Sequence, residues 1–458
     1  MKRQYALLGL LPILALVLGA AKHITEDSNA GFFGNAETNS QEMVKQGRQT
    51  FRFGTFGDQA FWGDQLRLHE AINGLTPRNA LGLGLKVDAA ALPPSVVDDI
   101  RNGKVNLDDP AVTRFLIKKK AVLGVVGFFN DKDQLRSVGL TCAVCHSTVD
   151  DSVVPGVGKR IDGLANRDLN VGAIIAAAPN LAPVVNLLKL ADAGITAQQV
   201  RKVLNSWGPG KFDAELFLDG KATNPQQITN GVVTGTNVPG ATLLPNARAL
   251  AGHNLHTWTG GWGTVTYWNA FVAVNEMHGI GTFFDERFDN AEQFPIAARA
   301  KLGHVSVDPD DDQVTSKLPA LHFYQLALPA LKPRKNVDFD PEAAARGDKL
   351  FSGKANCNSC HHEPLWTEPG WNQHTADEMK IDSFEADRAP GHAYQTVNLA
   401  GIFVRERGLF MFPQNKGRFY HDGRFQTLLD VVNSYDARFG LGLSEREKHD
   451  VIEYLKSL

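Results

Sequence analysis

The sequence contains the pattern Cys-x-x-Cys-His twice, as Cys-Ala-Val-Cys-His at residues 142–146 and as Cys-Asn-Ser-Cys-His at residues 357–361. In this pattern the two thiols bond to the two vinyl groups of one haem, and the adjacent imidazole lies under the iron as its proximal ligand. We therefore predict two covalently attached c-type haems. The residues expected to hold them are Cys142, Cys145 and His146 in the first half of the chain and Cys357, Cys360 and His361 in the second.

Zinc binding and disulfide formation are the two alternatives for these cysteines. All four cysteines of the chain fall in the two motifs, and the two pairs lie in opposite halves of the sequence. A four-cysteine zinc site usually has a short spacer between its pairs. Neither zinc nor a disulfide requires a histidine directly after each pair, so haem attachment explains the pattern best.

The composition is that of an ordinary globular protein. The 458-residue chain is 43% hydrophobic and 21% charged, with a formal net charge of −3. Such a length allows two or three domains. The chain lacks the excess of basic residues that would indicate a nucleic-acid partner. An acidic cluster at residues 308–312 is interpreted as a solvated loop, with a calcium site between domains as the alternative.

The first residues are typical of a signal peptide. Lys2 and Arg3 precede an apolar run over residues 5–18, and small residues follow at 19–21. We predict a signal peptide over residues 1–21, although an uncleaved anchor is the alternative. The apolar run is short for a membrane span, so we expect an exported, periplasmic protein with no stable membrane insertion after cleavage.

The second motif lies in a compact unit. Asp340 is a candidate N-cap for a helix over residues 342–351, in which Gly347 would allow another helix to approach closely. Ser444 and Glu447 form a capping box that opens the last helix. The inner face of that helix is expected to carry Val451, Ile452, Leu455 and Leu458. A helix just before the motif and another at the end of the domain is the cytochrome c arrangement.

The first half is less regular. Residues 22–130 mix polar loops with short apolar runs, residues 179–199 indicate an interrupted helix, and residues 206–264 read as an irregular insertion. No internal repeat is evident beyond the haem motif. We predict a mainly α fold of two cytochrome c-like haem domains with long irregular loops. The N-terminal haem domain, with its extension and insertion, would span residues 22–330, and the C-terminal domain residues 331–458.

With both motifs placed, the chain resembles the bacterial di-haem cytochrome c peroxidase superfamily. This group includes the di-haem enzyme that matures methylamine dehydrogenase and, more distantly, the haem-containing rubber oxygenases. The resemblance covers residues 318–458 and is carried by the segments 318–330, 346–351, 420–423 and 428–432. It implies that the C-terminal haem relays electrons to the N-terminal haem, where peroxide reacts, and that a tryptophan lies between the two.

The resemblance also implies an axial ligand for the second iron. When residues 428–432 are aligned with the family, Tyr435 takes the position of the methionine that ligates the iron in the peroxidases. Tyr435 then resembles the tyrosinate ligand of the methylamine dehydrogenase maturing enzyme, and an anionic oxygen ligand lowers the haem potential. A buried, non-ligating tyrosine is the alternative. The rival ligands are Met411, His392 and His421.

For the first iron, no histidine or methionine occurs between His146 and His253. We therefore favour an open coordination position there. The other candidate ligands are His253, His256 and His278.

The residues around the open position follow from the same resemblance. Trp258 resembles the bridging tryptophan and Glu276 the distal glutamate, which takes a proton from peroxide and delivers it to the leaving oxygen. Trp262 and Trp268 are alternatives for the bridge, and Glu276 could instead have a structural role.

These predictions together describe a periplasmic di-haem oxidoreductase that is peroxide-dependent. A small redox protein or a quinone-linked donor would supply the electrons, and the substrate would be peroxide itself or an organic or protein partner. The alternatives are a non-enzymatic di-haem electron carrier and a dioxygen-dependent haem oxygenase.

Overall fold

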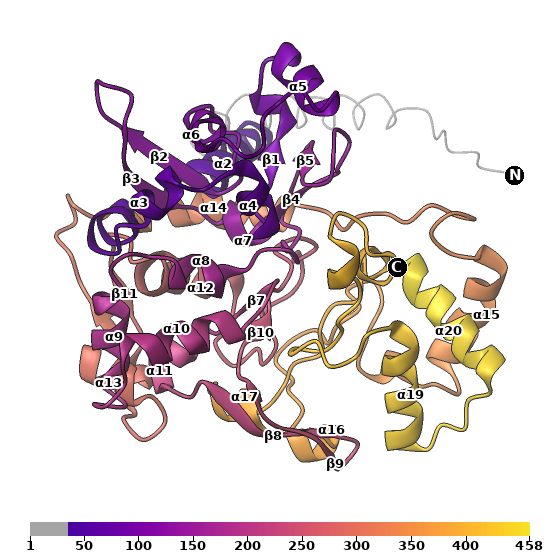
Figure 1. Ribbon diagram of the computed structural model, residues 1–458. Helices are drawn as coiled ribbons and strands as arrows, with labels where there is room; N and C mark the ends of the chain where they lie inside the picture. Colours follow the sequence, from indigo (N-terminus) through magenta and orange to yellow (C-terminus); the bar gives the residue numbers. More distant parts are fainter. Residues whose placement is uncertain (1–34) are drawn as a thin grey trace, which may run out of the picture.

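The computed structural model describes residues 35–458, so the predicted signal peptide lies outside the described residues. The described chain is mainly helical, and its short strands pair in two-stranded sheets (Figure 1). This confirms the prediction of a mainly α fold. Within residues 35–458, none of the helices is both long enough and apolar enough to cross a membrane.

Helices and strands alternate irregularly along the first half. Its helices are α2 (Ala36–Phe53), α3 (Leu68–Asn73), α4 (Pro77–Gly82), α5 (Pro94–Arg101), α6 (Pro110–Lys118), α7 (Ala143–His146), α8 (Val171–Ala176), α9 (Ala182–Leu188), α10 (Ala197–Ser206), α11 (Leu216–Asp219), α12 (Val265–Phe271), α13 (Pro295–Ala300) and α14 (Leu318–Ala327). The second half contains α15 (Pro341–Ser352), α16 (Ala376–Met379), α17 (Phe384–Asp387), α18 (Phe403–Arg407), α19 (Leu428–Phe439) and α20 (Glu445–Ser457).

All the strands belong to the first half. Parallel pairing joins β1 (Val87–Asp88) to β5 (Val157–Gly158). Antiparallel pairing joins β2 (Val125–Phe129) to β3 (Leu135–Leu140), β4 (Ser147–Val149) to β6 (Arg160–Asp162), β7 (Lys211–Phe212) to β10 (Thr242–Leu243), β8 (Thr223–Thr229) to β9 (Val232–Pro239), and β11 (Phe283–Phe284) to β12 (His304–Val305).

The two helices predicted around the second motif are present. Asp340 caps α15 by accepting hydrogen bonds from two backbone N–H groups of its first turn. Ser444 and Glu447 form the predicted capping box of α20. These helices pack closely at Gly347, where an added Cβ would collide with the backbone oxygen of Asp450. Glycine is therefore required at the crossing of α15 and α20.

A matching helix pair, α2 and α14, lies at the two ends of the first half, and no pattern in the sequence predicted it. An added Cβ at Gly47 in α2 would collide with the backbone oxygen of Ala320 in α14, just as at Gly347. Phe51 then packs edge-on against Tyr324, with ring centroids 5.6 Å apart. The corresponding rings of the second half are Phe351 and Tyr454, at 5.1 Å. The two halves therefore share this helix contact, although the sequence shows no internal repeat beyond the haem motif. α2 buries only Gly47 and Phe51, with Val44 partly buried against the same cluster, so its inward face is narrow.

We expect Gly347→Ala to destabilise the protein by about 1–3 kcal/mol, because overpacking a tight contact costs energy of this order. Gly82→Ala is the matched control, since an added Cβ at this helical glycine meets no atom within 4 Å. The control should be neutral or slightly stabilising. Urea unfolding of both variants measures the difference, and equal midpoints would contradict the close approach of α15 and α20.

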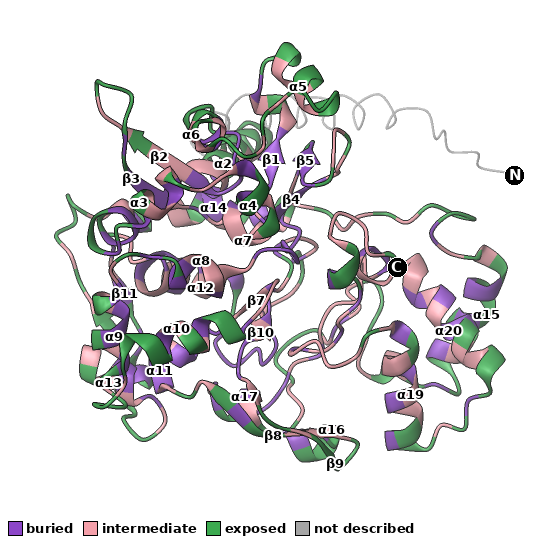
Figure 2. Ribbon diagram, in the orientation of Figure 1, coloured by how far each residue is buried: buried purple, intermediate pink, exposed green. Residues whose placement is uncertain are grey.

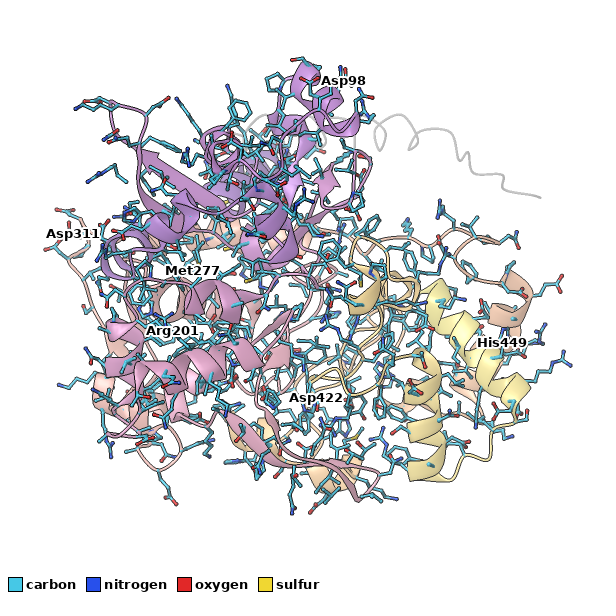
Figure 3. The ribbon with its side chains drawn as sticks, viewed as in Figure 1. Asp98, Arg201, Met277, Asp311, Asp422 and His449 are labelled. Atoms are coloured by element: carbon cyan, nitrogen blue, oxygen red, sulfur yellow. The ribbon has the colours of Figure 1, made fainter. Side chains whose placement is uncertain are left out.

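The predicted insertion over residues 206–264 joins the two halves. It contains the β8–β9 hairpin, whose second strand is largely exposed (Figure 2). The hairpin contacts the second half through hydrogen bonds from Asn224 Nδ2 to Asp382 Oδ1, at 2.9 Å, and from Gln227 Nε2 to Asp422 Oδ2, at 2.5 Å. Asp422 accordingly lies where the halves meet (Figure 3).

Candidate haem sites

The first motif places its cysteines and its histidine in the wall of one large cavity. The cavity has a volume of about 810 Å³, and its lining includes Cys142, Cys145 and His146. Most of the other lining side chains are apolar, among them Phe61, Leu68, Ile72, Val144, Ile174 and Phe271. A mostly apolar cavity of this size that carries two thiols and an imidazole fits a covalently attached haem.

His146 is oriented for metal binding by a hydrogen bond at its far nitrogen. Its Nδ1 lies 3.1 Å from the carbonyl oxygen of Pro245, so the Nδ1–H tautomer donates and Nε2 remains available. Burial lowers the pKa of His146 to about 4. The imidazole is therefore neutral at physiological pH, which is the form that ligates iron.

Glu276 lies in the wall of the same cavity, as the resemblance implies. It ends a single π-helical turn over Val272–Glu276, and such turns often occur at functional sites. Its Oε1 is buried and has no hydrogen-bond partner among the described residues. Burial, and secondarily the nearby Glu215, raise the pKa of Glu276 to about 8. Glu276 therefore holds a proton at neutral pH, so its base form is the minor form there.

The three candidate tryptophans differ in their surroundings. Trp258 lines the cavity, and its Nε1 donates to the Leu243 carbonyl oxygen at 2.8 Å. Its own carbonyl oxygen accepts a hydrogen bond from the Gln395 N–H of the second half, at 3.1 Å. Trp268 also lines the cavity. Trp262 instead packs in an aromatic cluster with Phe288 and Phe294. Trp258 thus touches both the cavity and the second half.

Of the histidines named as ligands for the first iron, His278 lines the cavity, together with Met277. The ring of His278 stacks on Phe61, with centroids 3.6 Å apart, and burial lowers its pKa to about 4. His253 and His256 do not belong to the cavity lining. His253 lies beside Leu365, which follows the second motif. The structure therefore brings one of the three candidates to the first site.

The second motif repeats the orientation of the first. His361 Nδ1 lies 2.8 Å from the Trp366 carbonyl oxygen, which leaves Nε2 available, and burial lowers the pKa of this histidine to about 4. Cys357 packs in a cluster with Phe351, Phe419 and Val432. In both motifs, a hydrogen bond from Nδ1 to a backbone carbonyl oxygen thus fixes the histidine tautomer and leaves Nε2 available as a ligand.

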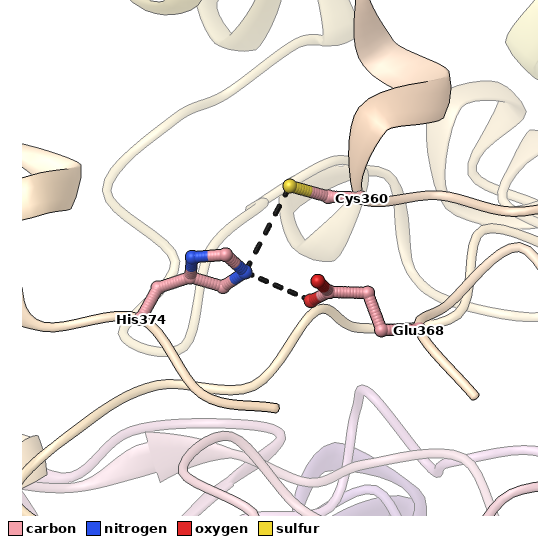
Figure 4. A group of neighbouring side chains, drawn as sticks. All are labelled: Cys360, Glu368 and His374. Atoms are coloured by element: carbon pink, nitrogen blue, oxygen red, sulfur yellow. Dashed lines mark hydrogen bonds and ion pairs between the residues drawn. The ribbon is translucent and has the colours of Figure 1, made fainter. Parts of the chain in front are cut away.

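An unpredicted polar group lies beside Cys360 (Figure 4). His374 Nε2 is 3.8 Å from Cys360 Sγ and 2.8 Å from Glu368 Oε2. Its Nδ1 contacts Glu378 Oε1 at 2.7 Å. Although burial lowers it, the pKa of His374 is raised overall, because the ring bonds to Glu378 and Glu368. No sequence motif signalled this group, since residues 368–378 approach Cys360 only in the folded chain.

Tyr435, the predicted ligand of the second iron, is half-buried on α19. The Arg438 guanidinium lies 4.2 Å from the centre of its ring. Burial, and then the nearby Tyr420, raise the pKa of Tyr435. Among the rivals, His392 is 61% exposed at its side chain and pairs with Asp387 at the surface. His421 is buried and stacks on Tyr394, while Met411 packs against Phe403 and Val404. Ligation by Tyr435 stays a prediction.

Tyr435→Phe is expected to change the spectrum of the second haem and to raise its potential, because the variant loses an anionic oxygen donor. Redox titration followed by visible absorption measures both effects. Tyr420→Phe, which alters the neighbouring hydroxyl, is the control. An unchanged spectrum and potential in Tyr435→Phe would direct attention to Met411 and His421.

The acidic cluster at residues 308–312 forms a turn in the structure. Asp311 is exposed (Figure 3). Asp312 accepts hydrogen bonds from the N–H groups of Thr282, Val314 and Thr315. Although its partial burial acts in the opposite direction, these bonds lower the pKa of Asp312 to about 2. The Asp312 carboxylate is therefore engaged by the backbone, which supports the solvated-loop interpretation.

Comparisons with known proteins agree with this chemistry. No family model matches the chain. The chain is 29% identical over 154 residues to a cytochrome-c peroxidase of Denitromonas iodatirespirans, a match that covers 25% of this chain and 40% of that protein. The chain therefore spans less than half the length of this curated relative.

Two solved structures show weaker similarity. One is a hydrazine synthase of Kuenenia stuttgartiensis, with 17% identity over 48% of this chain and 72% of that chain, and a TM-score of 0.31. The other is a MauG-like protein associated with microbial copper homeostasis, with 18% identity over 52% of this chain and 77% of that chain, and a TM-score of 0.28.

The chain thus carries two Cys-x-x-Cys-His motifs and is similar, over a quarter of its length, to a cytochrome-c peroxidase. The resemblance to the bacterial di-haem cytochrome c peroxidase superfamily, which the motifs indicated, is confirmed.

Proposed function

We propose that this protein is a periplasmic di-haem c-type cytochrome that reduces peroxide, with electrons entering at the C-terminal haem and passing to the N-terminal haem. The observation that carries the proposal is the position of Glu276 in the same cavity wall as Cys142, Cys145 and His146. An electron-transfer site needs no buried acid in its cavity. Cleavage of peroxide requires such an acid, because a proton must move from one peroxide oxygen to the other.

Different residues are assigned to iron ligation, proton transfer and electron transfer. A haem held at each motif supplies redox-active iron, with His146 and His361 as proximal ligands. The carboxylate form of Glu276 takes the proton of the inner peroxide oxygen and gives it to the outer oxygen, which departs as water. Trp258, which contacts both the cavity and Gln395 of the second half, lies on the route by which electrons reach the first site. A small redox protein or a quinone-linked donor would reduce the second site.

A di-haem electron carrier is the second candidate. Met277 and His278 also line the cavity, and either side chain could close the coordination position that peroxide requires. The two functions differ in the spin state of the first haem. The predicted signal peptide leads us to place either function in the periplasm.

The direct test uses the exported holoprotein. Haem should resist acid-acetone extraction, and intact mass should show two haem additions. Ferric EPR should show one high-spin haem, which binds cyanide, or carbon monoxide when reduced. A single addition would overturn the di-haem assignment. Two low-spin haems that are inert to both ligands would favour the carrier.

Trp258→Phe should leave the first reaction with peroxide intact and slow the sharing of oxidising equivalents with the second haem, because an aromatic ring between the two sites is made smaller. Trp262→Phe is the matched control, since Trp262 lies in the aromatic cluster and not in the cavity wall. Stopped-flow spectra resolve the two steps. Equal second-step rates in both variants would exclude Trp258 as the bridge.

A further inference from the structure

Three glutamates from separate parts of the chain line the first cavity. Glu215 directly precedes α11, Glu276 ends its π-helical turn, and Glu385 lies on α17 in the second half. Glu215 is 6% exposed and Glu385 is 4% exposed. Glu385 Oε2 has no hydrogen-bond partner among the described residues. The second half of the chain thus contributes to the wall of the first site a buried carboxyl group whose Oε2 accepts no hydrogen bond from the described residues.

The positive charge near Glu215 and Glu385 is the guanidinium of Arg388, which already binds two other carboxylates. The Arg388 side chain is 0% exposed, and it bonds Asp213 Oδ1 at 2.7 Å and Asp219 Oδ2 at 2.9 Å. Its distance to Glu385 Oε2 is 3.8 Å, which is beyond hydrogen-bond range. One guanidinium therefore faces four buried carboxyl groups, two of which it binds directly.

Glu215 and Glu385 cannot both be ionised at low cost, because a buried charge without a partner is strongly disfavoured. Burial, opposed by Arg388, raises the pKa of Glu215 to about 7. Burial, and then the proximity of Glu215, raise the pKa of Glu385 well above its usual range. The titratable and charged groups that face this pair are Asp213, Asp219, Glu276, Arg388 and Tyr394.

We propose that Glu215 and Glu385 hold one shared proton in the cavity wall and pass it to Glu276 during peroxide reduction. This inference rests on the proposed function and adds two positioning residues to it. Glu215, Glu385 and Glu276 line the same cavity, which is the arrangement that proton transfer among them requires.

The proton balance of the reaction shows why a proton-donating carboxyl pair is needed. The reaction H₂O₂ + 2 H⁺ + 2 e⁻ → 2 H₂O takes up two protons, and the electron donor supplies both electrons. Cleavage of the O–O bond only moves the peroxide's own proton through Glu276 and yields the first water. The remaining oxygen atom requires two protons from the protein. The pair gives its proton to the Glu276 carboxylate, Glu276 passes it to that oxygen, and solvent reprotonates the pair before the second transfer.

The test compares Glu215→Gln, Glu385→Gln and Glu276→Gln in the holoprotein. Infrared spectra between pH 5 and 9 monitor the C=O band of protonated carboxyl groups. We expect Glu215→Gln and Glu385→Gln to lose the same titrating band, which Glu276→Gln retains. In single-turnover stopped flow, both pair variants should still complete the peroxide step and then form the second water about 10-fold more slowly or worse, at the lower end of general acid–base effects.

Asp387→Asn is the matched control, because Asp387 lies on the same short helix as Glu385 but is exposed, with its side chain 51% accessible. It should change neither readout. Suppose that Glu276→Gln slows the peroxide step, while both pair variants keep the titrating C=O band or the wild-type rate of forming the second water. The shared proton is then refuted and the proposed function stands. If Glu276→Gln itself reacts at the normal rate, the proposed function fails. Glu215→Gln leaves the hydrogen bonds of Arg388 intact, so it remains informative if Glu385→Gln does not fold.

Discussion

Glu276→Gln is expected to slow the reaction of the ferric protein with peroxide by about 10²–10⁴-fold, the usual range for loss of a general acid–base group. Glutamine keeps the size of the side chain and cannot exchange the proton. The variant should still fold, attach haem and bind cyanide at the first site. Stopped-flow absorption after peroxide addition measures the rate.

The pH profile sharpens this prediction. The pKa of Glu276 is raised to about 8 by burial and by Glu215, and the carboxylate form accepts the first proton. The wild-type rate should therefore rise as pH increases through about 8, where the carboxyl group ionises. Glu276→Gln should lose this inflection. Wild-type speed in the variant would mean that Glu276 is structural and that another lining residue, such as His278, serves as the base.

Arg388→Met is expected to lower the free energy of unfolding by about 3–5 kcal/mol at pH 7, because removing one partner leaves buried charges uncompensated. The side chains of Arg388, Asp213 and Asp219 are all at most 1% exposed. Arg388 joins the segment 213–219 of the first half to α17 of the second half, so its loss should also loosen the contact between the halves. Urea unfolding of the holoprotein measures the effect.

The loss should depend on pH. Without Arg388, burial would raise the pKa of Asp213 further, so the folded state would hold a proton that the unfolded state releases. The stability of the variant should then be closest to wild type at low pH and should fall as pH rises above the unfolded value near 4. Arg78→Met is the control. Arg78 and Asp108 form a pair with side chains 61% and 65% exposed, and such exposed pairs contribute little to stability. Similar losses in both variants would contradict the argument.

The two Cys-x-x-Cys-His motifs could be recognised in the sequence because the chemistry that they indicate is local. Thioether bonds to one haem require two cysteines and a histidine within five consecutive residues, so the pattern is complete in the sequence. The helices around the second motif were also predictable, because Asp340 and the Ser444–Glu447 capping box act on the first turn of their own helices.

The first helix pair was missed for a physical reason. α2 meets α14 closely at a glycine and buries one aromatic ring, so its inward face carries few apolar residues and gives a weak signal in the sequence. Its resemblance to the α15–α20 pair becomes visible only when Gly47 and Gly347 are seen at equivalent crossings.

The sequence by itself determined the two haem motifs, the mainly helical class and the family resemblance, because each depends on residues close together in the chain or on aligned segments. Only the tertiary structure decided which of Trp258, Trp262 and Trp268 reach the cavity, and that Glu215 and Glu385 stand in its wall with Glu276. Glu385 comes from the other half of the chain, and no local pattern records which distant carboxyl groups will share one buried space. Burial then sets their protonation, since the cost of a buried charge depends on the whole surrounding fold.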